Sequence, residues 1–94
     1  MISKIDERTW KSEWLVFHDR GKIDGGVTNL YEVQSNNVML GLVMWKAGWR
    51  RYTFRPAVYT EFDFSCLTTI AEFVKMVTDE RKAHWGQQGR FADR

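Results

Sequence analysis

The sequence predicts an α+β domain: a four-stranded antiparallel β-meander with one long C-terminal helix packed on one face. Three observations lead to this fold class. Short segments rich in β-branched and aromatic residues alternate with turn residues, which is typical of antiparallel strands. Apolar residues then recur at three- and four-residue spacing after position 63, which predicts a helix. The chain has 94 residues and is 44% apolar, so a single domain over 1–94 with one core is expected.

The N-terminal half is expected to contain the sheet. Residues 1–13, "MISKIDERTWKSE", are interpreted as an N-terminal extension in which Asp6 caps a short helical turn. The glycines of "RGKIDGG" predict a turn at 20–26, and Pro56 ends the last strand because it has no backbone N–H. The four strands are expected at 14–19, 28–35, 38–45 and 49–55, within a sheet region that spans 14–56.

Two hairpin turns predict which side chains share a face of the sheet. Asn36 and Asn37 suit a two-residue turn because asparagine tolerates positive φ, and "KAG" at 46–48 suits a three-residue connection. The resulting register places Trp45 opposite Trp49. The core face is then expected to carry Tyr31, Val33, Leu40, Leu42, Tyr52 and Phe54. The uncovered face is expected to carry Leu30, Glu32, Val43, Trp45, Trp49, Arg51, Thr53 and Arg55.

A helix is predicted over 63–85. Asp63 is a suitable N-cap, and Phe62 and Leu67 stand at the positions of a hydrophobic staple. The polar residues 86–94 are expected to form a flexible tail. The apolar stripe of the helix is formed by Leu67, Ile70, Ala71, Val74 and Val77, and Cys66 and Phe73 widen it.

Residues 40–77 resemble a group of small, uncharacterised proteins encoded in phage and prophage genomes. The shared pattern is close to Leu-Gly-x-Val/Ile-x-Trp, then Trp-Arg-x-Tyr-x-Phe-x-Pro, then a Phe, then Cys-Leu-x-x-Ile-Ala-x-Phe-Ile/Val. The matching residues are Leu40, Gly41, Val43, Trp45, Trp49, Arg50, Tyr52, Phe54, Pro56, Phe62, Cys66, Leu67, Ile70, Ala71, Phe73 and Val74. The resemblance implies a phage-type origin and an accessory protein that binds a host protein. It assigns no catalytic residue.

One segment combines tryptophan with cations. From Val33 to Thr60 the sequence contains no acidic residue and four cations, whereas the whole chain has a formal net charge of only +2. An indole flanked by arginines can stack on bases or contact a protein, and Trp and Arg are enriched in binding hot spots. The alternative is that the two tryptophans form a structural cross-strand pair. The predicted binding surface consists of Trp45, Trp49, Arg51, Arg55 and Lys46.

Other reactive residue types are expected to be structural. Arg50 is placed on the core face, paired with a helix carboxylate. His18 and His84 lack neighbours at metal-ligand spacing, and Cys66, the single cysteine, is expected to be a small buried residue. No metal, cofactor or enzymatic activity is therefore expected. The longest apolar run, 38–45, is far shorter than the ~20 residues that cross a bilayer.

The sequence therefore predicts a small phage-type accessory protein that binds a host protein in the cytoplasm of a bacterial host. An anti-CRISPR-like inhibitor of a host defence or replication factor is the first expectation. The alternative is a nucleic-acid-binding module that uses the same aromatic and basic face, with affinity that falls as salt rises. A homodimer that buries the uncovered face is a further alternative.

Overall fold

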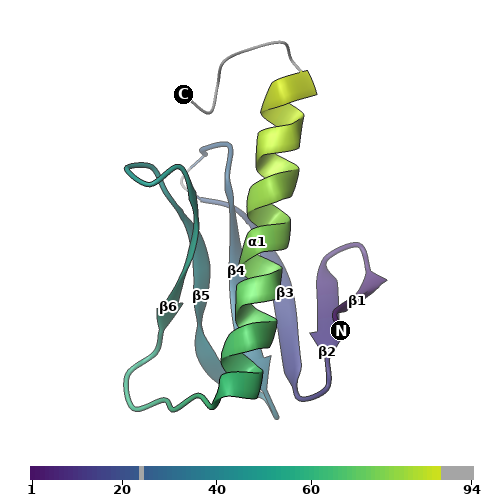
Figure 1. Cartoon of the computed structure of the whole chain (residues 1–94), viewed down its shortest axis with the longest axis vertical. Helices are drawn as coiled ribbons and strands as arrows, with labels where there is room; N and C mark the ends of the chain where they lie inside the picture. Colours follow the sequence, from purple (N-terminus) through teal and green to yellow (C-terminus); the bar gives the residue numbers. More distant parts are fainter. Residues whose placement is uncertain (24, 88–94) are drawn as a thin grey trace.

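A computed structural model describes residues 1–23 and 25–87, and within them the chain forms one antiparallel sheet and one helix. The strands are β1 (Ser3–Asp6), β2 (Thr9–Ser12), β3 (Leu15–Lys22), β4 (Asn29–Ser35), β5 (Val38–Lys46) and β6 (Arg51–Pro56), and the helix is α1 (Phe64–Gln87). Each strand pairs with the next along the chain, so the sheet order is β1-β2-β3-β4-β5-β6. The helix crosses one face of this meander (Figure 1). The predicted fold class is confirmed, but the described sheet has six strands where four were expected.

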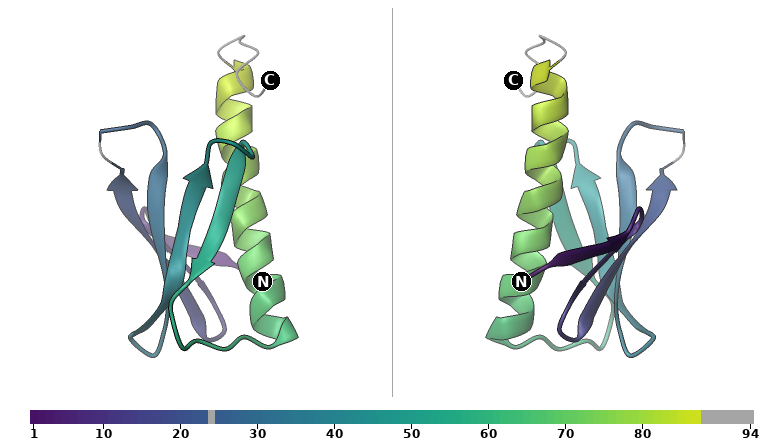
Figure 2. Two further views of the ribbon diagram at one scale, coloured as in Figure 1. Left: turned by 90° about the vertical axis from the view of Figure 1, so that its left-hand side faces the viewer. Right: turned by 90° about the vertical axis from the view of Figure 1, so that its right-hand side faces the viewer.

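The two additional strands lie in residues 1–13, where a helical turn was predicted. That prediction was wrong because Asp6 stabilises a turn between two strands: the Arg8 backbone N–H donates to its Oδ1 at 2.8 Å. β1 and β2 curve toward the helix side of the sheet (Figure 2). Trp10 of β2 is 7% exposed and belongs to the core. The segment is therefore part of the domain.

The core lies between the sheet and α1, and aromatic rings occupy its centre. Phe73 of α1 is fully buried and stacks on Phe17 of β3 with ring centroids 4.2 Å apart. Phe73 also makes T-shaped contacts with Trp10 and Tyr31, with ring centroids 5.3 Å and 5.2 Å apart. Burial of ~150–250 Å² by each ring makes this cluster a main source of stability. The Phe73 ring thus reaches β2, β3 and β4, while the helix backbone lies closest to β6.

The first predicted hairpin turn is confirmed, but a bulge follows it. Asn36 and Asn37 have φ of 51° and 65°, and Ser35 pairs with Val38 as the two-residue turn requires. Further along, Gln34 pairs with Met39 and Val33 pairs with Gly41, so Leu40 is an extra residue in β5. Because side chains alternate between the two faces of a strand, one extra residue moves every later side chain of β5 to the face opposite the one predicted.

The bulge corrects the predicted faces of β5. Val43 is fully buried on the helix side, and Trp45 lies on that side with its ring 5.2 Å from Tyr52. Leu42, expected in the core, pairs with Arg55 on the outer face, which is the side of the sheet away from α1. Val33, Tyr31, Tyr52 and Phe54 lie on the helix side as predicted.

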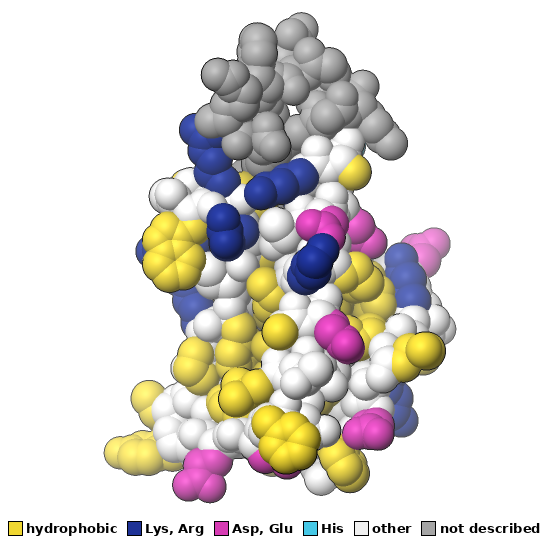
Figure 3. Space-filling model, in the orientation of Figure 1, with side chains coloured by type: hydrophobic (Ala, Val, Ile, Leu, Met, Phe, Trp, Pro, Cys, Tyr) yellow, Lys and Arg dark blue, Asp and Glu magenta, His cyan; other side chains and the backbone are white. Residues whose placement is uncertain are grey.

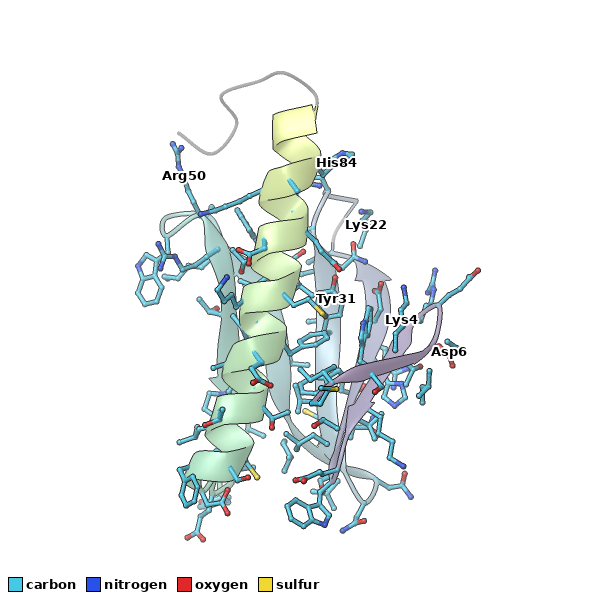
Figure 4. All side chains as sticks on the ribbon, turned by 45° about the vertical axis from the view of Figure 1, so that its right-hand side comes forward. Lys4, Asp6, Lys22, Tyr31, Arg50 and His84 are labelled. Atoms are coloured by element: carbon cyan, nitrogen blue, oxygen red, sulfur yellow. The ribbon has the colours of Figure 1, made fainter. Side chains whose placement is uncertain are left out.

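The second hairpin turn is longer than predicted. β5 ends with Lys46 paired to Arg51, so residues 47–50 form the turn and Trp49 has no strand partner. The expected Trp45–Trp49 pair is therefore wrong. Arg50, expected on the core face, is exposed in the turn with φ of 56° (Figure 4).

The helix begins as predicted and is only partly covered by the sheet. Asp63 is the N-cap, because its Oδ1 accepts the Cys66 N–H at 2.9 Å. Ile70, Phe73 and Val77 are buried, whereas Leu67 is 50% exposed and Ala71 is exposed. The apolar stripe is thus wider than the sheet surface beneath it. The helix continues to Gln87, and the rest of the predicted tail, 88–94, lies outside the described residues.

Candidate functional site

The β5–β6 turn exposes a tryptophan among cations. The backbone N–H groups of Trp49 and Arg50 both donate to the Lys46 carbonyl, at 3.0 and 2.9 Å, which holds the turn closed. The Trp49 side chain is 60% exposed, and Lys46 Nζ lies 5.2 Å from its ring centroid. Arg51 Nε donates to the Trp49 carbonyl at 3.1 Å. The turn therefore has an ordered backbone and a solvent-exposed indole.

The neighbouring arginines extend this positive charge along β6. Arg51 and Arg55 are exposed and lie on the outer face, opposite Lys46 and Leu42. Figure 3 shows basic side chains gathered toward the end of the molecule that carries the β5–β6 turn and the C-terminal half of α1. We call Lys46, Trp49, Arg50, Arg51 and Arg55 the hairpin surface.

Four of the five predicted binding residues belong to the hairpin surface, and Trp45 does not. Trp45 is half-buried on the helix side and packs against the core. Only one indole therefore remains beside the cations, and Lys46 covers part of it. Stacking of successive bases uses several aromatic platforms. A single exposed Trp among arginines is instead typical of an anchor in a protein interface.

A second feature, which the sequence did not predict, is a groove between β6 and α1. It has a volume of about 540 Å³. Its floor is apolar, and its sides carry three cations and one carboxylate. The floor consists of Tyr52, Phe54, Leu67, Ile70, Ala71 and Val74, and the charged residues are Arg51, Lys75, Asp79 and Lys82. We call this the β6–α1 groove. The wide apolar stripe of the helix was the sequence signal for it.

The free edge of β6 is blocked to another strand at two positions. The Tyr52 backbone N–H, which points away from β5, donates to Thr78 Oγ1 of α1 at 3.0 Å. Pro56 has no N–H to donate. Sheets commonly protect their edge strands in these two ways. A ligand in the β6–α1 groove must therefore be recognised mainly through side chains.

The loop from β6 to α1 exposes apolar side chains in a strained turn. Val58 is 81% exposed and Tyr59 is fully exposed. Tyr59 has φ of 61°, a conformation that costs a side-chain-bearing residue ~1–2 kcal/mol. The turn is held by Thr60 Oγ1, which donates to the Ala57 carbonyl at 2.7 Å. Strain of this kind is concentrated at functional sites.

Asp19, Asn29 and Tyr52 form a hydrogen-bond network between the sheet and the helix. Asn29 Nδ2 donates to both carboxylate oxygens of Asp19, at 2.8 and 3.0 Å, and its backbone N–H donates to the Tyr52 hydroxyl at 3.2 Å. Tyr31 lies beside them, facing the helix (Figure 4). Burial raises the pKa of the Tyr31 and Tyr52 hydroxyls, so both are neutral donors at physiological pH. This network orders the core.

The remaining candidates are placed as the sequence predicted, with one exception. His18 is half-buried on the outer face and His84 is exposed. Cys66 is half-buried, less enclosed than expected, and burial raises the pKa of its thiol. Within residues 1–23 and 25–87, no three His, Cys, Asp or Glu side chains are grouped as metal ligands.

No protein-family model, curated protein or solved structure matches this chain. The part of α1 that the structure describes is not apolar enough to cross a membrane, and no other described helix is present.

Proposed function

We propose that this protein is a small phage-type accessory protein that binds a host protein through its hairpin surface. The observation that carries the proposal is the exposed indole of Trp49, held in an ordered turn beside Lys46, Arg50 and Arg51. Aromatic and arginine side chains supply most of the energy at protein interfaces. The partner surface is expected to be acidic, because four cations on the hairpin surface repel a basic one.

The biological effect that fits this proposal is inhibition of a host defence or replication factor, in the manner of an anti-CRISPR protein. The basis is the resemblance of residues 40–77 to small phage and prophage proteins. A domain of 11.2 kDa that binds an acidic active-site cleft blocks it sterically and needs no catalytic group. The second function, nucleic-acid binding through the same cations, is separated from the first by the experiment below.

The test is affinity capture from bacterial lysate on the immobilised full chain, with and without nuclease. The decisive variant is Lys46→Ala/Trp49→Ala, which removes the stacked pair from an exposed turn. The matched control is Lys11→Ala/Trp14→Ala, which removes an exposed lysine and a tryptophan that is 64% exposed elsewhere. We expect the wild type and the control to retain one nuclease-resistant protein and the decisive variant to lose it.

Two results contradict the proposal. Capture that disappears with nuclease and falls steeply with salt assigns the surface to nucleic acid. Equal capture by the Lys46→Ala/Trp49→Ala variant and the wild type removes the hairpin surface from the binding site. Circular dichroism of each variant shows whether the fold is retained.

A further inference from the structure

The loop between β6 and α1 combines bulky apolar side chains with negative charge. Val58 is 81% exposed and Tyr59 is fully exposed, so their apolar surface lies in water. Glu61 and Asp63 follow directly, and both are exposed. Phe64 at the start of α1 is 83% exposed. These residues lie within one short stretch, so any partner of this loop must have an apolar hollow with positive charge around it.

The β6–α1 groove of the same protein has these properties. Its floor is apolar, and Ala71 leaves it hollow because the alanine side chain is small and exposed there. The groove is bordered by three cations, Arg51, Lys75 and Lys82, and by one carboxylate, Asp79. Asp79 is already paired with Lys75 at 2.6 Å. The excess positive charge therefore faces outward, complementary to the acidic loop.

The positions of loop and groove allow two copies to pair mutually. The loop joins the end of β6 to the start of α1 (Figure 2, left), and these are the two elements that line the groove. Two complementary patches side by side on one surface can meet each other about a twofold axis, because each copy then supplies one loop and one groove. We infer that the protein forms a symmetric dimer in which residues 57–63 of each copy dock in the β6–α1 groove of the other.

Pairing through side chains is favoured over extension of the sheet. The Tyr52 N–H is already bonded to Thr78, and Pro56 has no N–H, so β6 cannot form a regular ladder with a second copy. The left-handed backbone at Tyr59, with φ of 61°, directs the ring into solvent at the tip of the turn. In the dimer this strained position holds the anchor that enters the hollow above Ala71.

This dimer uses a different surface from the one expected from the sequence and does not depend on the proposed function. It buries the loop and the groove and leaves the outer face free. Trp49 and Lys46 lie in the β5–β6 turn, at the opposite end of β6 from the loop. Each dimer thus keeps Lys46, Trp49, Arg50 and Arg55 of both hairpin surfaces accessible, and only Arg51, which also borders the groove, is shared with the dimer contact.

The experiment is sedimentation equilibrium of the full chain across a wide concentration range. The wild type is expected to reach twice the monomer mass of 11.2 kDa. Tyr59→Gly removes the anchor and relieves the strained backbone, and Ala71→Trp fills the groove at an exposed helix position. Each is expected to weaken dimerisation about tenfold or more, as removal of an interface anchor does.

Matched controls separate the interface from general effects of the substitutions. Ala83→Trp makes the same change at an exposed position of α1 outside the groove, and Trp14→Ala removes another exposed aromatic residue. Both are expected to dimerise like the wild type. Tyr59→Asn also removes the Tyr59 ring, and asparagine tolerates the left-handed conformation at this position, so this variant tests the anchor without introducing a glycine.

Three results overturn the inference. A wild type that stays monomeric at high concentration shows that loop and groove do not pair. If Tyr59→Gly, Tyr59→Asn or Ala71→Trp dimerises as strongly as the wild type, the dimer uses another surface. Assemblies that grow beyond two copies show an open, non-reciprocal contact.

Discussion

Replacing Trp45 and Trp49 by alanine, one at a time, tests the register on which the functional assignment depends. The two residues are four apart and flank one turn, yet the structure gives them different surroundings. Trp45 is half-buried on the helix side, with its ring 5.2 Å from Tyr52 in an edge-on contact. Trp49 is 60% exposed, and Lys46 Nζ lies 5.2 Å from its ring centroid. Their loss should therefore have unequal effects on the free energy of unfolding.

The magnitudes follow from the buried area. An aromatic ring buries ~150–250 Å², which at ~25 cal/mol per Å² stabilises by ~4–6 kcal/mol when burial is complete. Trp45 is more than half buried, so roughly two thirds or more of this, ~3–5 kcal/mol, is lost in Trp45→Ala. Trp49→Ala loses an exposed cation–π contact worth ~0.5–1 kcal/mol. For a domain of this size each 1 kcal/mol corresponds to a change of ~4–8 °C in Tm.

Urea unfolding followed by circular dichroism measures both variants without using tryptophan emission. We expect Trp45→Ala to be the less stable by at least ~1 kcal/mol, while Trp49→Ala keeps near wild-type stability and loses partner capture. Trp14→Ala, which removes a 64% exposed ring, is the control for an exposed tryptophan. Equal destabilisation by Trp45→Ala and Trp49→Ala would refute the register of β5 and β6 described above.

Two further predictions concern the core. Gly41→Ala should destabilise the fold by ~1–3 kcal/mol in urea unfolding, because the added Cβ would lie 2.5 Å from the Arg55 carbonyl oxygen and 2.7 Å from the Phe54 ring. A variant as stable as the wild type would show that Gly41 is not tightly covered. Burial raises the pKa of Tyr31 and Tyr52, so the fold favours their neutral forms. The contribution of these two tyrosines to stability should be constant below the ordinary tyrosine pKa of 10.0 and fall as pH rises above it. Tyr31→Phe should reduce this alkaline loss when unfolding is measured at successive pH values, and no alkaline loss in the wild type would contradict the reasoning.

Local chain chemistry accounts for the elements that the sequence predicted correctly. The Asn36-Asn37 turn forms because both residues adopt positive φ at little cost, and this needs no distant partner. The start of α1 depends on Asp63 and an N–H three residues later. Trp49 was expected on a strand, on the face that the helix leaves uncovered, and it lies instead in the turn, where it is exposed.

Contacts between distant segments decided the features that the sequence did not reveal. The extra residue at Leu40 turns Gly41 and Trp45 toward the helix side, and at Gly41 a Cβ would lie 2.7 Å from the Phe54 ring of the next strand. The sequence did not reveal β2 because the burial of Trp10 depends on a residue far along the chain. The Phe73 ring of the helix lies 5.3 Å from the Trp10 ring, centroid to centroid. Alternation over four residues is too short a signal to predict such a strand.

The sequence by itself determined the fold class, the main strands, the helix cap and a basic segment free of acidic residues, because each follows from backbone preferences or composition over a few residues. The tertiary structure alone decided which tryptophan is exposed, and it formed the β6–α1 groove. The first depends on the bulge in β5 and the longer β5–β6 turn, and the second on where the helix lies against the sheet. Phe73 of α1 packs on Phe17 of β3 while the helix backbone lies closest to β6, and part of the apolar stripe is left uncovered in the groove between α1 and β6. Periodicity shows that a helix has an apolar side, but the surface that covers it is set by packing between elements far apart in the chain.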